Sequence, residues 1–236
     1  YGAVHPHYFT EKDRAEGYAL LCQARPLSDV TIEVRELDGL EGIVVKTVPC
    51  RVMTIEKPVP DVAVLKVRLP LNENMRFVAG QYIEFLLKEG KRRAYSIASK
   101  PKPEGTIDLE LHVRHTPGGV FTDHVFSKMK ERDLLRFEGP FGTFYLREES
   151  AKPIVLVASG TGFAPIKSIC EYAFERGINT ARPMTLYWGC RSRSDLYMFD
   201  LPARWAAEQQ NFRFVPVLSD PAPDDAWTGR TGFVHR

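Results

Sequence analysis

Long hydrophobic runs are missing from this sequence, in which hydrophobic residues make up 44% and charged residues 26% of 236. No segment reaches the roughly 20 apolar residues that a membrane-spanning helix needs. The N-terminal stretch YGAVHPHYFTEKDRAEG is too polar for a signal peptide. Cysteine is also scarce, and the four cysteines are too scattered for a secreted disulfide framework. These absences predict a cytoplasmic protein with no membrane partner.

An excess of one charge is missing as well, because 32 basic and 30 acidic residues leave a formal net charge of +2. Nucleic acids and anionic membrane surfaces attract strongly basic proteins, so neither is predicted as a partner. The length allows two domains, each with its own core. The sequence begins at Tyr1 rather than methionine and ends in TGRTGFVHR, which closes no helix or strand. We therefore expect a piece of a longer protein.

Residues 43–148 carry the alternation that is typical of strands. In TIDLELHVRH, apolar residues at positions 107, 109, 111 and 113 alternate with polar ones, so that one face of the strand is apolar. Five or six such strands predict a small antiparallel β-barrel. One helix interrupts them after TPGG, where Phe121, Val125 and Met129 recur at helical spacing.

The pattern changes after residue 148. The apolar run IVLVAS, typical of a strand covered on both faces, leads into GTGFAP and a helix. MTLYWGC and FRFVPVLS are further strands, with a helix at DLPARWAAEQQ between them. Alternating strands and helices predict a parallel sheet. The sequence thus predicts an α+β architecture, with a β-barrel followed by an α/β domain over residues 149–236.

Two segments of the barrel have the chemistry to bind a phosphate-bearing aromatic ligand. In RRAYSIAS, Arg93 offers a planar fork of donors to phosphate, Tyr95 a ring face, and Ser96 a hydroxyl for a ring heteroatom. Alone, this pattern fits an ordinary barrel strand equally well. In HVRHTPGGVFTDH, two glycines open a helix, where backbone N–H groups and the helix dipole favour an anion. A simple turn with a glycine N-cap is the alternative.

The most specific segment is IVLVASGTGFAP, in which a strand runs through a glycine loop into a helix. This arrangement rests a dinucleotide pyrophosphate on a helix N-terminus, and Pro165 suits the first helical position. It is not GxGxxG, and a tight turn is the alternative. A fourth segment, YWGCRSRSDLY, places Arg191 and Arg193 after the next strand. They could reach a ribose phosphate or adenine, or lie in a solvated loop.

In this order, the motifs resemble the ferredoxin-NADP reductase superfamily, over residues from about 43 to the end. RAYS is similar to its flavin motif, GGVFT to its flavin-phosphate loop, GTGFAP to its nicotinamide-pyrophosphate loop, and WGCRSRSDLY to its ribose and adenine region. Longer stretches resemble one group, the bacterial CDP-6-deoxy-3,4-glucoseen reductases, iron–sulfur flavoproteins of deoxysugar synthesis. The reductases of aromatic-ring oxygenases are an alternative, as is a non-enzymatic nucleotide-binding or partner-docking module.

The resemblance implies FAD in the barrel and NADH or NADPH on the α/β domain. A hydride would pass from the nucleotide to the flavin, then single electrons to a 2Fe-2S cluster and on to an acceptor protein, a dehydrase or an oxygenase component. The resemblance assigns Ser96 and Tyr95 to the reaction. The cofactor-binding residues that it implies are Arg93, Tyr95, Ser96, His112, Val113, Arg114, Gly118, Gly119, Val120, Phe121, Thr122, Gly160, Thr161, Gly162, Phe163, Ala164, Pro165, Gly189, Cys190, Arg191, Arg193 and Asp195.

The segment GYALLCQARPLSDVTIEV resembles the last part of a plant-type ferredoxin domain. Residues 1–42 are then the remnant of that domain with its linker. Such a domain holds its cluster by C-x4-C-x2-C and a distant fourth cysteine, which makes Cys22 the fourth ligand. The other three ligands would lie upstream, so the cluster is expected in the full-length parent only. The family's C-G-P-P segment is absent, and the α/β domain is expected to be incomplete at its C-terminus.

Overall fold

The computed structural model describes residues 9–21, 23–33 and 40–236. The chain divides into two compact units, Tyr1–Asp38 and Gly39–Arg236. The first unit contains the short helix α1 (Glu11–Ala15), where the Thr10 hydroxyl accepts from the Asp13 N–H and the Asp13 carboxylate accepts from the Thr10 N–H. Cys22 lies outside the described residues. The ferredoxin remnant and its metal ligand therefore stay predictions.

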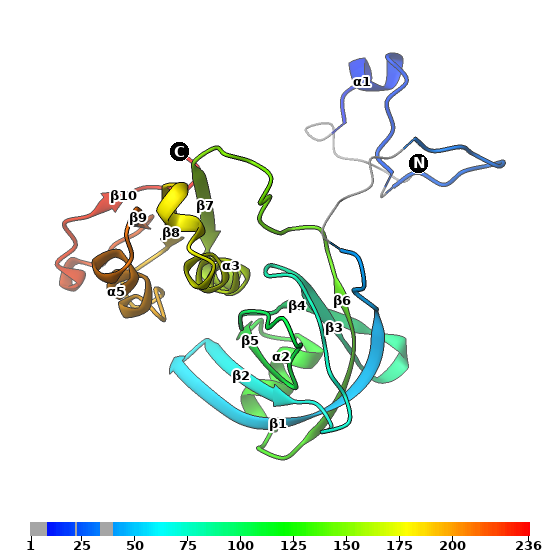
Figure 1. Ribbon diagram of the computed structural model, residues 1–236, viewed down its shortest axis with the longest axis horizontal. Helices are drawn as coiled ribbons and strands as arrows, with labels where there is room; N and C mark the ends of the chain where they lie inside the picture. Colours follow the sequence, from blue (N-terminus) through cyan, green and yellow to red (C-terminus); the bar gives the residue numbers. More distant parts are fainter. Residues whose placement is uncertain (1–8, 22, 34–39) are drawn as a thin grey trace. The chain divides into compact units, whose positions relative to one another are not determined.

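Six antiparallel strands form the first sheet of the second unit, in the order β4-β3-β6-β1-β2-β5 (Figure 1). The two outer strands also meet, because Ile97 after β4 pairs with Leu111 of β5, and the Ala98 N–H donates to the Glu110 carbonyl at 2.7 Å. The sheet therefore closes into the predicted barrel. Its elements are β1 (Lys46–Val59), β2 (Val62–Arg68), β3 (Tyr82–Leu86), η1 (Lys88–Gly90), β4 (Arg92–Ser96), β5 (Asp108–Arg114), α2 (Val120–Ser127) and β6 (Leu134–Phe141).

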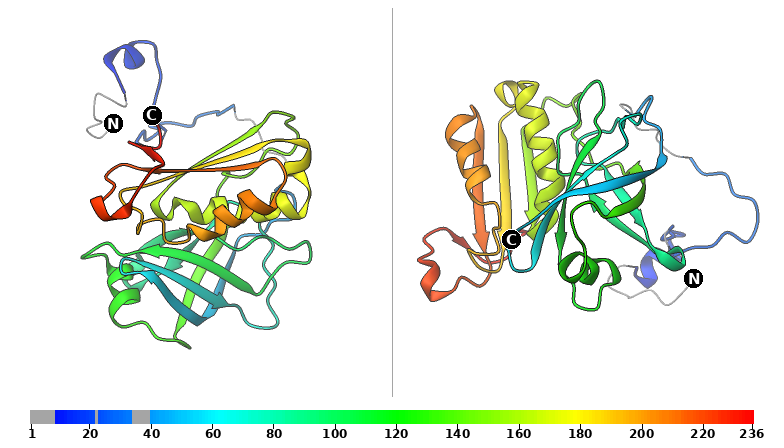
Figure 2. Two further views of the ribbon diagram at one scale, coloured as in Figure 1. Left: turned by 90° about the vertical axis from the view of Figure 1, so that its left-hand side faces the viewer. Right: turned by 90° about the horizontal axis from the view of Figure 1, so that it is seen from below.

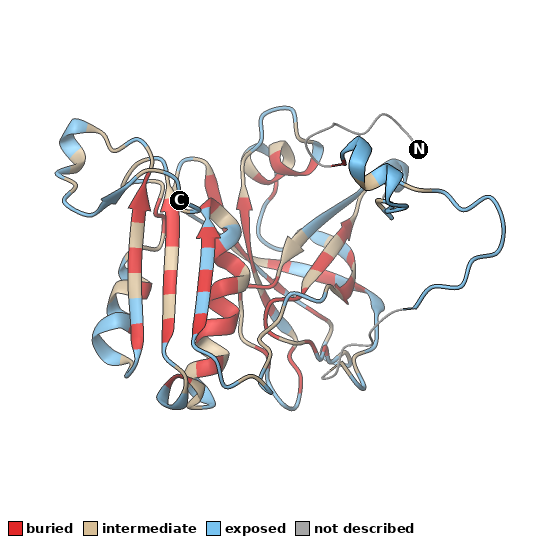
Figure 3. Cartoon of the chain, turned by 90° about the horizontal axis from the view of Figure 1, so that it is seen from above, coloured by how far each residue is buried: buried red, intermediate tan, exposed pale blue. Residues whose placement is uncertain are grey.

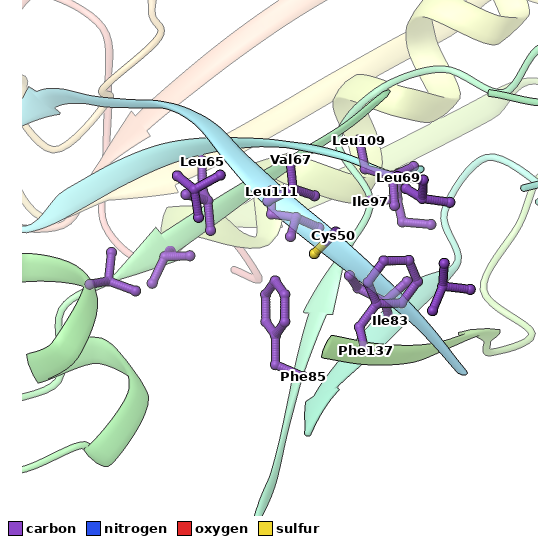
Figure 4. Close-up of a cluster of buried hydrophobic side chains, with 14 of the residues drawn as sticks. Cys50, Leu65, Val67, Leu69, Ile83, Phe85, Ile97, Leu109, Leu111 and Phe137 are labelled. Carbon is purple, nitrogen blue, oxygen red and sulfur yellow. The ribbon is translucent and has the colours of Figure 1, made fainter. Parts of the chain in front are cut away.

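Aliphatic and aromatic side chains fill the barrel interior, where Phe85 and Phe137 lie among leucines and valines from several strands (Figure 4). Cys50 of β1 is part of this core, and burial raises the pKa of its thiol to about 12. That thiol stays protonated and inert. Helix α2 contributes Phe121 and Val125 to the core. It ends at Ser127, so it is shorter than the sequence pattern predicted.

Four parallel strands form the second sheet, in the order β10-β9-β8-β7. Ser159, Gly189 and Val217 are neighbours across it at the carboxyl ends of three strands, so the loops after β7 and β8 emerge at one edge. Helices α3 and α5 lie on one side of this sheet (Figure 2). The elements are β7 (Ile154–Ser159), η2 (Gly160–Gly162), α3 (Phe163–Glu175), α4 (Ile178–Ala181), β8 (Met184–Cys190), α5 (Asp200–Glu208), β9 (Phe212–Leu218), η3 (Pro223–Asp225) and β10 (Arg230–Thr231).

Two details of the second sheet differ from the sequence prediction. Strand β7 is buried on one face only: buried and exposed residues alternate along it, and Val155 and Val157 are 65% and 51% exposed (Figure 3). The side chains of α3 cover just one of its faces. Pro165 is the third residue of α3 rather than the first, and the first helical turn tolerates it because N–H groups there have no partner within the helix.

The sheets change between Phe141, where β6 ends, and Ile154, where β7 begins. The predicted boundary between residues 148 and 149 falls in this connection and stays a prediction. Over the residues described, no helix combines the length and the apolar character that crossing a membrane requires.

Candidate functional site

Strand β4 brings the three residues of the RAYS motif to one cavity. It pairs antiparallel with β3, with Phe85 opposite Arg93 and Ile83 opposite Tyr95. The cavity has a volume of about 520 Å³ and is shared by the barrel and the loop after β7. Its lining consists of Arg93, Ala94, Tyr95, Ser96, His112, Arg114, Thr116, Gly119, Phe121, Thr122, Thr161, Gly162 and Ala164.

Tyr95 is supported from behind by other rings. Its ring centroid lies 5.3 Å from that of Phe121 and 6.0 Å from that of Phe85, and both phenylalanines are buried. Burial raises the pKa of Tyr95 to about 12, although the positive charge of Arg93 lowers it in part. The phenol is therefore neutral at pH 7. A neutral ring fixed in this way is a surface on which a flat aromatic ligand can stack.

Arg92 and Arg93 are neighbours with different surroundings. Arg92 forms ion pairs with Glu84, at 3.2 Å, and with Glu138. Arg93 donates to the Arg92 carbonyl at 2.7 Å, and no carboxylate of the described chain lies within ion-pair distance of it. The second guanidinium is therefore available to a phosphate, for which its planar fork is well suited.

Ser96 ends β4 at the wall of the cavity. Its hydroxyl has no hydrogen-bond partner among the residues that the structure describes. A hydroxyl can both donate and accept, so this group can bind a polar atom of a ligand that enters the cavity.

The loop before α2 is only partly open to a ligand. Helix α2 begins after Gly119 without a side-chain cap, and Gly119 lines the cavity. The Gly118 N–H instead donates to the Asp123 carboxylate at 3.1 Å, so this donor already has a partner within the chain. Val113 is buried in the barrel and Val120 is 54% exposed, and neither lines the cavity. Roles for Gly118, Val113 and Val120 stay predictions.

The loop after β7 presents its backbone to the same cavity through Thr161 and Gly162. Gly160 has φ +52°, a conformation that favours glycine, and its carbonyl accepts from the Trp188 indole N–H at 3.0 Å. Gly162 has ordinary helical angles, and a Cβ added there would meet no atom within 4 Å. The fold therefore does not require glycine at position 162, whereas close approach of a ligand to the backbone would.

Phe163 and Pro165 do not line the cavity. Phe163 is fully buried and stacks on Trp188 with ring centroids 4.1 Å apart. Its side chain belongs to the core of the second sheet, so a contact with a nucleotide could come only from its backbone. Helix α3 has no side-chain cap, but the Phe163 N–H bonds to the Gly160 and Thr161 carbonyls and Pro165 has no N–H, so few donors at this helix start are open to a ligand.

The segment after β8 is organised by Asp195, whose carboxylate accepts from the Ser192 N–H and the Arg191 guanidinium, each at 3.3 Å. Arg191 is 72% exposed, and Arg193 lies 3.7 Å above the Phe199 ring. None of the predicted residues from Gly189 to Asp195 lines the 520 Å³ cavity. The segment does emerge beside the Gly160 loop, as the sheet register requires.

Burial raises the pKa of the Cys190 thiol to about 11, and its Sγ donates to the Asp195 carbonyl at 3.3 Å. Gly189 approaches Val234 so closely that an added Cβ would lie 2.5 Å from its Cβ. Both residues thus have structural explanations, and their predicted contacts with a nucleotide stay predictions. Across the described ranges, no group of three His, Cys, Asp or Glu side chains is arranged to hold a metal ion.

Sequence reasoning missed a set of polar residues directly behind the cavity. Lys167 of α3 lies 3.3 Å from Glu110 of β5, and the Tyr197 hydroxyl lies 2.7 Å from Nδ1 of His112. The available signal was Lys167 itself, a lysine on the otherwise apolar face of a helix. Thr116 is a further cavity residue; it lies in the segment HVRHTPGGVFTDH but was not among the predicted site residues.

Comparison with known proteins identifies the family. Residues 49–145 match the oxidoreductase FAD-binding domain, and residues 156–236 match the oxidoreductase NAD-binding domain. The CDP-6-deoxy-L-threo-D-glycero-4-hexulose-3-dehydrase reductase of Yersinia pseudotuberculosis is 42% identical over 229 residues, which cover 97% of this chain and 67% of that protein. The chain belongs to the ferredoxin-reductase-type family of FAD- and NAD-binding oxidoreductases. The predicted family, the antiparallel barrel followed by a parallel α/β domain, and the FAD- and NAD-binding domains are confirmed, whereas the 2Fe-2S cluster of the full-length parent stays a prediction.

Other relatives belong to oxygenase systems. The reductase component 2 of terephthalate 1,2-dioxygenase from a Comamonas species is 36% identical over 218 residues, or 92% of this chain and 63% of that protein. The crystal structure of the Amycolatopsis cytochrome P450 reductase GcoB matches with a TM-score of 0.74 and 36% identity, over 98% of this chain and 68% of that one. The chain thus spans about two thirds of the length of these relatives.

Proposed function

We propose that this chain is the reductase part of an electron-transfer flavoenzyme, which takes a hydride from NADH or NADPH and passes single electrons to an acceptor protein. The observation that carries the proposal is the shared cavity, in which Arg93, Tyr95 and Ser96 of the barrel face Thr161 and Gly162. Bound FAD supplies chemistry that no side chain has, since it takes up a hydride and gives up electrons one at a time.

The residues of the cavity have separate tasks in this proposal. Arg93, which lacks a carboxylate partner in the described chain, binds a flavin phosphate. Tyr95 supports the flavin ring and Ser96 hydrogen-bonds its edge, which fixes the face that the nucleotide approaches. The open backbone at Thr161 and Gly162 seats the pyrophosphate of the nicotinamide dinucleotide at the start of α3.

For the acceptor, we propose the dehydrase system of CDP-6-deoxy-3,4-glucoseen reduction in deoxysugar synthesis. The 42% identity to a CDP-6-deoxy-hexulose-dehydrase reductase supports this choice; the identity to the reductase of the terephthalate dioxygenase is 36%, and to the reductase subunit of an aromatic O-demethylase 40%. In the full-length parent, electrons would pass through a 2Fe-2S cluster with Cys22 as one ligand. Between the nucleotides we favour NADH on the family resemblance alone, because Arg191 pairs with Asp195 but the Arg193 guanidinium has no carboxylate partner among the described residues.

Purification with added FAD, followed by anaerobic titration with NADH, tests the function. We expect a yellow protein that retains stoichiometric FAD and loses its flavin absorbance on reduction. A protein that takes up no flavin would favour the non-enzymatic nucleotide-binding module. Turnover of the full-length parent with a dehydrase and with an oxygenase component then distinguishes the two acceptor classes.

The Ser96→Ala variant tests the assignment of the cavity. It should retain FAD but be reduced by NADH more slowly, by roughly tenfold or more, because the lost hydrogen bond orients the ring. Stopped-flow absorbance measures the rate. Ser150→Ala, a hydroxyl outside the cavity, is the control. Equal rates for the two variants would remove Ser96 from the proposed site.

A further inference from the structure

Three alternate residues on one face of β5 each contact a different residue of the second sheet's helices and loops. Glu110 lies 3.3 Å from Lys167, His112 lies 2.7 Å from Tyr197, and Arg114 lies 3.7 Å from Asp195. Successive side chains of a strand alternate between its faces, so these three residues share one face while Leu109, Leu111 and Val113 fill the barrel from the other. Strand β5 is therefore covered on both faces around His112, while Arg114 at its end stays 35% exposed.

The protons of the central pair can be assigned. The His112 side chain is fully buried, and burial lowers the pKa of His112, so its ring is neutral at pH 7. Glu110, whose pKa is about 2 because bonds to His112 and Lys167 outweigh its burial, is a carboxylate and can only accept. Nε2 of His112 therefore donates to Glu110 at 3.0 Å, and Nδ1 accepts from the Tyr197 hydroxyl.

Buried polar contacts of this kind contribute little net stability compared with apolar packing, but their geometry is directional. The bonds of Lys167 to Glu110 and of Tyr197 to His112 require the arrangement of the two sheets that the structure shows, whereas Arg114 also pairs with Asp61 of the barrel at 2.8 Å. Two of the three contacts are made by Asp195 and Tyr197, which belong to the segment after β8 that also carries Arg191 and Arg193. At the other end, His112 and Arg114 belong to the cavity wall.

We propose that the Tyr197–His112 hydrogen bond positions the segment after β8 relative to the flavin cavity, with Tyr197 as a positioning residue for the transfer from nucleotide to flavin. The proposal rests on the proposed function, because it assigns the segment and the cavity to the nucleotide and the flavin. Tyr197 is suited to the task because its ring is already held edge-on to both Trp188 and Phe163. Its hydroxyl can therefore be removed without removing its packing.

Tyr197→Phe in the flavin-loaded protein is the test, with Tyr172→Phe as the matched control. Tyr172 also donates to an acceptor, Glu148 at 2.6 Å, but it does so away from β5. We expect Tyr197→Phe to retain FAD and to lower the limiting rate of flavin reduction at saturating NADH roughly three- to tenfold, as one buried hydrogen bond allows. Hydrogen exchange of residues 190–199 should become faster. The control should change neither quantity.

His112→Gln is a second variant, since it keeps a donor for Glu110 and lacks the acceptor for Tyr197. If the pair acts as a unit, the double variant should be no slower than either single variant. An unchanged limiting rate in Tyr197→Phe, with or without faster exchange, or an equal loss in Tyr172→Phe, would overturn the proposal. A wild-type protein that holds no flavin would instead contradict the proposed function. Hydrogen exchange of residues 190–199 in the flavin-free variants would still test whether the Tyr197–His112 hydrogen bond holds that segment.

Discussion

Lys167 on α3 places its ammonium nitrogen 3.3 Å from a carboxylate oxygen of Glu110 on β5. The same nitrogen lies 3.0 Å from Glu171, and the side chains of Lys167 and Glu110 are only 11% and 16% exposed. Removing one partner from such a pair leaves an uncompensated buried charge.

Lys167→Met should therefore lower the free energy of unfolding by about 3 kcal/mol. Urea unfolding followed by circular dichroism measures the change. Lys100→Met is the control, because Lys100 pairs with Glu175 at 2.8 Å in a more exposed position, and such pairs contribute little. If both variants lowered the free energy of unfolding equally, burial of the Lys167–Glu110 pair would not explain the loss.

Acidification should destabilise the protein, starting near pH 6.5. Burial holds the pKa of His112 below its usual 6.5, and the pKa of Glu110 is about 2. As the pH falls, the unfolded chain therefore takes up protons at both residues before the folded protein does, and the free energy of unfolding decreases. Glu171, whose pKa burial raises, opposes this trend, because the folded protein takes up that proton before the unfolded chain does.

Urea unfolding at intervals between about pH 8 and pH 4 measures this dependence. His112→Gln should flatten the curve in the upper part of that range and leave the part due to Glu110. A curve of unchanged slope in the variant would mean that other groups control the acid sensitivity.

Arg93→Ala should release the flavin. The loss of one charge-assisted contact to phosphate corresponds to a roughly 10- to 100-fold weaker Kd for FAD. Arg92→Ala is the control, since it removes the same side chain from the neighbouring position, where it pairs with Glu84 and Glu138. Fluorescence titration with FAD measures both affinities. A comparable loss of FAD affinity in both variants would show that the overall positive charge of β4 matters rather than a specific contact of Arg93.

Gly162→Val should raise the KM for NADH while FAD stays bound. The added side chain enters the open space beside the backbone and meets no protein atom at Cβ, so thermal stability should change little. Gly160→Val should instead destabilise the fold, because φ is +52° there and Arg114 lies 3.0 Å from the added Cβ. Steady-state kinetics and thermal unfolding separate the two effects. An unaltered KM in Gly162→Val would leave this loop with a structural role only.

The inward residues of both sheets could be predicted from the sequence because apolar side chains are buried whatever covers the opposite face. Leu109, Leu111 and Val113 are buried in the barrel, as their alternation indicated. The same reasoning identified the cavity residues Arg93 and Tyr95, whose spacing on one strand fixes their common side.

The partners of polar residues could not be predicted in this way. A glutamate that alternates with leucines has the same pattern whether it faces water or a buried lysine, and Glu110 faces Lys167. Nor does an apolar run reveal how many of its faces are covered, which is why the exposure of Val155 was not foreseen. Both facts depend on contacts between segments that are distant in the sequence.

The covering of β5 on both faces around His112 has a consequence for how this strand can change. A shift of β5 by one residue would turn Glu110 and His112 into the barrel and Leu111 toward Lys167. Such a shift would disrupt both the barrel core and the buried polar contacts with α3. An inserted or deleted residue inside Asp108–Arg114 would therefore disturb the barrel core or the contacts with the helices and loops of the second sheet. Length variation is instead expected in the exposed turn at Lys88–Gly90, where neither interior is disturbed.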